Sequence, residues 1–220
     1  MSIDLQADLT TLRRSVLEMC GIIEVRFDQA LHGLFRNQRD DSLEVRHGDA
    51  DVNEMEIEIE AQCLNILALG QPVAGDLRFV LSVMRINSSL ERIGDLTKSI
   101  AKRSLSLFKH PMPLPDGLPT MADTTRTMLL SCVQSFANED VESARRVRQS
   151  DQIVDVLQKE VITWAQEAIA EQVDTTTAAI DIMSIARKLE RIADLATNIA
   201  EDVILVAQGR NLKHHEKLAG

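Results

Sequence analysis

Residues 90–96 read LERIGDL, and residues 189–195, ninety-nine positions later, read LERIADL. The two heptapeptides share six of their seven letters and differ only where Gly94 in the first is replaced by Ala193 in the second. A near-identical segment at nearly half the chain length indicates an internal duplication. The position that differs is small in both copies, which is typical of a place where two helices pack closely.

Each heptapeptide contains a glutamate followed four residues later by an aspartate. Glu91 precedes Asp95 in the first copy, and Glu190 precedes Asp194 in the second. Residues i and i+4 lie on the same face of a helix, so each copy predicts a helix that projects two carboxylates together. The sequence around them leaves two readings open: a solvated acidic face, or a duplicated carboxylate site.

The heptapeptides lie within long helical patterns. Apolar residues recur every three or four positions, and strand-like alternation is absent. Helices are expected at about 5–34, 49–69, 74–108, 118–136, 143–170 and 175–208, with Asp174 as the N-cap of the last and Gly209 at its end. Because the stretch KHPMPLPDGLP at 109–119 holds four of the five prolines, it predicts a break between two halves.

The expected fold is all-α, with two tandem three-helix bundles related by internal duplication. The first repeat is expected at 1–110, a proline-rich linker at 111–117, the second repeat at 118–212 and a polar tail at 213–220.

Composition narrows the class of protein. The formal net charge of −10 disfavours binding to nucleic acid or to an anionic membrane. No secretory signal or transmembrane segment is predicted. Three widely spaced cysteines within helical patterns are expected to be reduced core thiols, which favours a cytoplasmic protein.

A second acidic row is expected opposite each heptapeptide. Asp49 and Asn53 stand four apart, and the midpoint of 53 and 91 falls at Pro72, the predicted turn of that hairpin. In two antiparallel helices, residues equidistant from the turn lie level. Asn53 is therefore expected at the level of Glu91, and Asp49 at the level of Asp95.

The second half repeats this arrangement. Asp151 and Asp155 also stand four apart, and the midpoint of 155 and 190 falls within the predicted turn between 171 and 174. Carboxylates gathered on two facing helices repel one another unless a proton, a basic side chain or a bound cation neutralises them. Oxygen ligands suit a hard or borderline cation and not a thiolate-type zinc site.

Two enzymatic alternatives have little support. A ferritin-like di-iron site requires Glu-x-x-His, whereas Gly94 and Ala193 stand at i+3 after each motif glutamate. A metal-dependent hydrolase lacks a Ser or Cys nucleophile with a His partner, a P-loop and a glycine-rich phosphate cradle. The chain is therefore predicted not to be an enzyme.

Three segments resemble the PhoU proteins of bacterial phosphate regulation. They are QPVAGDLRFVLSVMRINSSLERIGDL at 71–96, DADVNEME at 49–56 and RKLERIADLATNIAED at 187–202. The resemblance implies two three-helix bundles and metal sites at the E-x-x-x-D motifs. It places ligands at the following residues: Asp49, Asn53, Glu91, Asp95, Asp151, Asp155, Glu190 and Asp194.

The resemblance also implies a function. Proteins of this family are cytoplasmic, often dimeric, negative regulators of the phosphate-starvation response, and the resemblance implies the same role here. Such a protein contacts the ATPase subunit of the phosphate ABC transporter and a PhoR-type sensor histidine kinase, and binds Fe, Mn, Mg or Zn. The alternatives are a structural helical metal-binding scaffold and a regulator of a different transporter. Leu96 and Leu195 depart from the family pattern, and Asn53 replaces a carboxylate, so the more acidic second site is favoured.

Overall fold

The computed structural model describes residues 4–36, 38–47 and 50–208, and within them it is entirely helical. Three long helices form each half, with one short additional helix in the first. The helices are α1 (Leu5–Phe35), α2 (Arg39–His47), α3 (Ala50–Asn65), α4 (Ala74–Leu107), α5 (Gly117–Asn138), α6 (Val141–Glu171) and α7 (Thr176–Gln208). The predicted all-α fold with two tandem helical bundles is confirmed.

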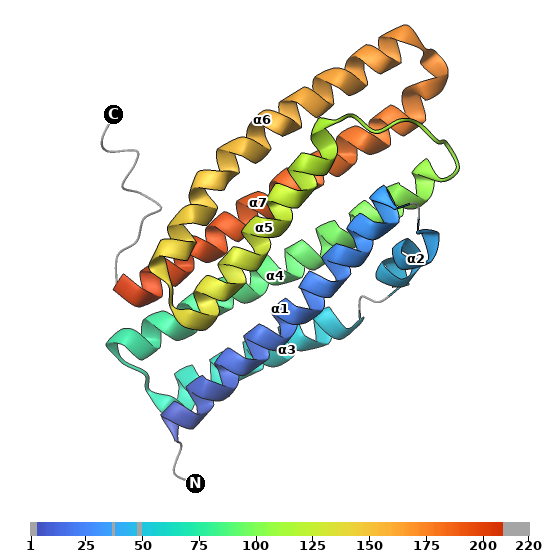
Figure 1. Ribbon diagram of the computed structural model, residues 1–220. Helices are drawn as coiled ribbons and strands as arrows, with labels where there is room; N and C mark the ends of the chain where they lie inside the picture. Colours follow the sequence, from blue (N-terminus) through green and yellow to red (C-terminus); the bar gives the residue numbers. More distant parts are fainter. Residues whose placement is uncertain (1–3, 37, 48–49, 209–220) are drawn as a thin grey trace.

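The third helices of the two halves, α4 and α7, pack against each other at the centre of the molecule. Helix α1 packs on α4, α5 packs on α7, and α3 and α6 pack on α4 and α7 respectively. The long helices run side by side along one common direction (Figure 1). One hydrophobic core continues through both halves, so the two repeats form a single packed body.

Two ion pairs join α4 to α7. Arg85 Nε lies 2.9 Å from Asp202 Oδ1, and Arg103 Nη1 lies 2.8 Å from Asp181 Oδ1. Both aspartate side chains are buried, with 4% and 3% of their surface exposed, whereas the arginines are about half exposed. A buried carboxylate needs such a partner because desolvation penalises its charge. The two pairs therefore fix how the repeats sit against each other.

The helix boundaries differ from the prediction in two places. Helix α2 was not predicted, because its sequence RDDSLEVRH is short and strongly polar. Asp174 does not cap α7; it lies in a 3₁₀ turn, Val173–Thr175, that precedes the helix. Gly209, the expected end of α7, and the tail at 213–220 lie outside the described residues.

The turn between α3 and α4 is tight. Helix α3 ends in a π-helical turn, Ile66–Gly70. Gln71 and Ala74 then adopt left-handed backbone conformations on either side of Pro72, with φ of 47° and 45°. Since residues other than glycine seldom occupy this region, the turn is a strained part of the backbone.

Candidate functional site

The four acidic side chains of the second half gather between α6 and α7. Asp151 and Asp155 lie on α6, and Glu190 and Asp194 lie on α7. Three of them, Asp151, Asp155 and Glu190, are half-buried, while Asp194 is exposed. The i, i+4 spacing puts the two acids of each helix on one face, and the repulsion between acids of α6 and α7 shows that the two rows lie near each other.

Burial and repulsion among the four acidic side chains raise the pKa values of three of them. Burial raises the pKa of Asp151, and the carboxylates of Asp194 and Asp155 raise it further. Burial also raises the pKa of Glu190, with added repulsion from the other three acids. The pKa of Asp194, whose side chain is only partly desolvated, is raised by that desolvation and by the Asp155 carboxylate. The four side chains thus form one group in which each negative charge opposes its neighbours.

Arg191 is the basic side chain that offsets this repulsion. It lowers the pKa of Glu190 and of Asp194, although both remain above their ordinary values. The pKa of Asp151, which Arg191 does not lower, is also above its ordinary value. The group therefore has the charge and the donor atoms that attract a divalent or trivalent cation.

In the first half, the structure places Asn53 on α3 and Glu91 and Asp95 on α4. Asp49 lies outside the described residues. Asn53 and Asp95 are exposed, and Glu91 is half-buried. This half thus shows three of its four predicted residues, of which one is a neutral amide.

Two contacts fix the register of α3 against α4. Asn87 Nδ2 donates a hydrogen bond of 2.9 Å to the backbone carbonyl of Glu56. A Cβ atom built on Gly94 would lie 3.4 Å from Val52 Cγ1. Since Val52 precedes Asn53 and Gly94 precedes Asp95, these contacts bring the predicted residues of α3 and α4 to the same part of the hairpin.

No group of three or more His, Cys, Asp and Glu side chains within the described residues is arranged to hold a metal ion. The acids of the second half are close enough to repel one another, but their oxygens do not converge on one point. Side-chain rotation would be needed to bring them around a cation. The carboxylate oxygens are donors that suit a metal ion. In the rotamers of this structure, however, they do not surround one common point.

A cavity of about 380 Å³ lies between α4 and α7, where the two heptapeptides meet. Its walls contain the same three positions from each copy, together with one amide. The lining residues are Arg92, Asp95, Leu96, Arg191, Asp194, Leu195 and Asn198. Spacing alone predicts two separate motifs, whereas in the structure both motifs line the same cavity. The arginine that recurs at the same position of each heptapeptide, Arg92 and Arg191, is the sequence feature from which this shared cavity could have been predicted.

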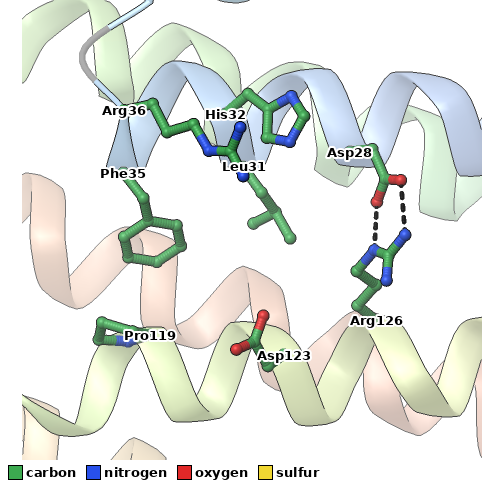
Figure 2. A pocket seen from close by; sticks show the side chains of 8 residues that line it. All are labelled: Asp28, Leu31, His32, Phe35, Arg36, Pro119, Asp123 and Arg126. Atoms are coloured by element: carbon green, nitrogen blue, oxygen red, sulfur yellow. Dashed lines mark hydrogen bonds and ion pairs between the residues drawn. The ribbon is translucent and has the colours of Figure 1, made fainter.

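A second cavity, of about 570 Å³, lies between α1 and α5. Figure 2 shows Asp28 and Arg126 facing each other across it, joined by two contacts of 2.5 and 2.8 Å. Leu31 and Phe35 project into the space from α1, opposite Pro119 on α5. Its lining contains no residue of the duplicated motif. Because its paired charges connect the first helices of the two repeats, we assign it to inter-repeat packing.

The arrangement defines a class of protein: a duplicated helical bundle with one carboxylate motif per repeat. The sequence profile of the PhoU domain matches residues 16–104 and 118–203. The chain belongs to the PhoU family, a non-catalytic family of phosphate-transport accessory and regulatory proteins.

Individual relatives cover nearly the whole chain. The phosphate-specific transport system accessory proteins PhoU of Serratia marcescens and of Escherichia coli are 31% and 30% identical to it. Each alignment spans 209 residues, or 94% of this chain, and covers 86% and 87% of those relatives. The absence of enzymatic activity predicted from the sequence agrees with this family.

Solved structures of relatives share the fold. The crystal structure of PhoU from Pseudomonas aeruginosa matches with a TM-score of 0.90 and 31% identity, covering 94% of this chain and all of that one. The phosphate transport system regulatory protein PhoU from Streptococcus pneumoniae matches with a TM-score of 0.88 and 26% identity, covering 95% and 99%. Both repeats and their relative placement are thus those of the family.

Proposed function

We propose that this protein is a negative regulator of the phosphate-starvation response. It would act in the cytoplasm, as a homodimer, between the ATPase subunit of a phosphate ABC transporter and a PhoR-type sensor histidine kinase. Support comes from the relatives, which are phosphate-specific transport accessory proteins matched over 94% of the chain. Among the described residues, no helix is long and apolar enough to span a bilayer.

The observation that carries the mechanism is the coupled group of acids between α6 and α7. Asp151, Asp155, Glu190 and Asp194 would hold a cation of Fe, Mn, Mg or Zn, which supplies positive charge where the folded chain has concentrated negative charge. The corresponding first site would use Asn53, Glu91 and Asp95 with Asp49. The second site is the stronger candidate because all four of its described side chains are acids.

Cation binding would alter how α6 rests on α7. Without compensation, like charges on the two helices push them apart, and rotation of the acids toward a common cation removes that repulsion. Asp194 also lines the cavity at the centre of the molecule. A change at the second site would therefore reach the region where the two repeats pack against each other.

A reporter experiment tests the regulatory role. In a strain that lacks this gene, we expect a phosphate-starvation reporter to be active in high phosphate and to be repressed again by the wild-type gene. The double variant Glu190→Gln/Asp194→Asn should restore repression incompletely. A deletion strain that keeps its reporter repressed in high phosphate would contradict the proposal.

Affinity purification with the transporter ATPase and the kinase, with and without added metal, tests the partners. Binding to both proteins supports the coupling role. The alternative of a structural metal-binding scaffold predicts metal binding without either partner. The alternative of a different transporter predicts binding to an ATPase subunit of another transport system.

A further inference from the structure

A third cavity, of about 720 Å³, lies where the linker between α4 and α5 meets the end of α6. Figure 1 shows this linker at the same end of the molecule as the turn between α6 and α7. Met112 and Pro113 line the cavity from the linker, and Trp164, Glu167 and Glu171 line it from α6. None of the residues in its walls belongs to the duplicated motifs or to the proposed metal sites.

Helical spacing places the three α6 residues on one face of the helix. Glu167 follows Trp164 by three positions, and Glu171 follows it by seven. Trp164 is half-buried and packs against the hydrophobic core, as does Met112 of the linker. Both glutamates are exposed. The cavity thus combines an aromatic and apolar inner wall with two carboxylates that face solvent.

The charge around this cavity is negative and has no basic counterpart in its walls. The described residues that line it include Glu167 and Glu171 but no lysine, arginine or histidine. Within the described chain, neither glutamate makes an ion pair. The basic residues nearest in sequence, Lys109, His110 and Lys159, are exposed and do not line the cavity. The two carboxylates are therefore available to an external cation.

The end of α6 adds to this preference for a cation. The C-terminal end of a helix carries partial negative charge, which basic side chains in the last turn usually offset. Helix α6 has no basic residue in its last turn, and its final residue is Glu171. A bound cation would supply the positive charge that the sequence of α6 does not provide.

The first repeat shows that the fold does not require this arrangement. Buried positions of α6 stand 102 residues after buried positions of α3, as Val161 does after Ile59. In this register, Trp164 corresponds to Gln62, which has no aromatic ring. The tryptophan is thus a feature of the second repeat and not of the bundle.

We propose that this cavity binds a guanidinium group, the chemistry shared by a free arginine-like molecule and by an arginine side chain of a partner protein. A planar guanidinium can stack on the indole ring of Trp164 while its N–H groups donate to Glu167 and Glu171. An ammonium group has no planar face and is more strongly hydrated, so it gains less from the same walls. The volume falls within the range of about 300–1,000 Å³ that is usual for small organic ligands. The proposal depends neither on the metal sites nor on the regulatory role.

The test uses the fluorescence of Trp164, which reports on this cavity alone because the chain has one tryptophan and no tyrosine. Purified full-length protein is titrated with Nα-acetyl-arginine methylamide, with the corresponding lysine derivative and with the neutral citrulline derivative. A nine-residue peptide of glycine and serine with one central arginine represents an arginine carried by a protein.

The decisive variant is Glu167→Gln/Glu171→Gln, which removes both carboxylates and keeps the tryptophan. The matched control, Glu54→Gln/Glu58→Gln, removes two exposed carboxylates with the same four-residue spacing from α3 and changes the net charge equally. Because all four replaced side chains are exposed, we expect the circular dichroism and urea unfolding of both variants to match wild type.

We expect a saturable change in Trp164 fluorescence with both arginine ligands. Binding should be at least tenfold weaker in the Glu167/Glu171 variant and within twofold of wild type in the Glu54/Glu58 control. The lysine derivative should bind at least fivefold more weakly than the arginine derivative, and the citrulline derivative should not bind. Tighter binding of the peptide than of the arginine derivative would support a protein-borne arginine, and equal or weaker binding a free molecule.

Three results would overturn the proposal. The first is the absence of a saturable change with either arginine ligand. The second is equal weakening in the two glutamate variants, which would show that only the net charge of the protein matters. The third is binding of the lysine or citrulline derivative as tight as that of the arginine derivative, because the cavity would then not recognise the guanidinium group.

Discussion

Arg92 and Arg191 occupy the same position in the two heptapeptides, and both line the one cavity between α4 and α7. Asp95 and Asp194, three residues further along each helix, line it as well. The duplication has therefore placed its two acidic motifs on either side of a common space. Each motif thus has an arginine beside it, and Arg191 lowers the pKa of Glu190 and of Asp194.

The first prediction concerns this arginine. The variant Arg191→Gln should bind Mn²⁺ at the second site more tightly than wild type, because a positive charge near the acids is removed. The expected gain is about fivefold, corresponding to roughly 1 kcal/mol, the interaction of two unit charges about 4 Å apart in water. Titration calorimetry measures it. Arg145→Gln removes the same charge from an exposed site at the start of α6 and serves as the control; equal affinities in all three proteins would contradict the account.

The second prediction concerns the seam between repeats. Arg103→Ala removes the partner of Asp181 and leaves a buried carboxylate, 3% exposed, without its ion pair. The expected loss in the free energy of unfolding is about 3 kcal/mol. Arg145→Ala breaks an exposed contact of 3.4 Å to Glu142 and should cost about 0.5 kcal/mol or less. Urea unfolding distinguishes them, and similar losses in the two variants would show that Asp181 does not depend on Arg103.

The third prediction concerns the one residue that differs between the heptapeptides. Gly94→Ala should leave stability unchanged or raise it by up to about 1 kcal/mol, because alanine favours helix and its Cβ would meet Val52 Cγ1 at 3.4 Å. Gly94→Leu should lower stability by about 1–3 kcal/mol, since its larger side chain must displace α3. Thermal unfolding of both variants checks this, and a well-tolerated leucine would mean that α3 is not closely packed there.

Much of the fold follows from the sequence alone. The repeated heptapeptide, the period of apolar residues and the prolines at 111–119 predict two helical bundles, and the structure confirms them. Helix α2 could not be predicted in this way. Its nine residues are mostly polar, and only its contacts with α1 and α4 hold it in place.

The site was less accessible to sequence reasoning. Spacing predicts that Glu190 and Asp194 project together and lie level with Asp155 and Asp151 respectively, and the mutual repulsion of these acids agrees with that proximity. Spacing does not predict the cavity shared by the two motifs. That feature depends on how α4 crosses α7, which is set by contacts such as Arg85 with Asp202 and Arg103 with Asp181. These pairs are 117 and 78 residues apart in sequence.

The fourth prediction concerns Glu24, beside the ion pair of Asp28 and Arg126. Burial, followed by the Asp28 carboxylate, raises the pKa of Glu24 above its ordinary value of 4.5, while Arg126 lowers it. A carboxyl whose pKa is higher in the folded state favours folding when protonated. Its contribution is full below the unfolded pKa and is lost as pH rises through the folded pKa.

Glu24→Gln should therefore be more stable than wild type at pH 7, by about 0.5 kcal/mol or less given the partial exposure of this side chain. The difference should shrink as pH falls toward 4. Urea unfolding of both proteins at several pH values measures it. A variant less stable than wild type at pH 7 would show that the Glu24 carboxylate is held favourably by Arg126.

Bound metal in the purified protein shows whether the acids between α6 and α7 form a metal site. Wild-type protein, Glu190→Gln/Asp194→Asn and Glu91→Gln/Asp95→Asn would be purified identically without chelator, and bound Fe, Mn, Mg and Zn measured by elemental mass spectrometry. The account predicts metal in the wild type, loss of most of it in the Glu190/Asp194 variant and a smaller loss in the Glu91/Asp95 variant. Equal, near-zero metal in all three proteins, even after incubation with each ion, would contradict it.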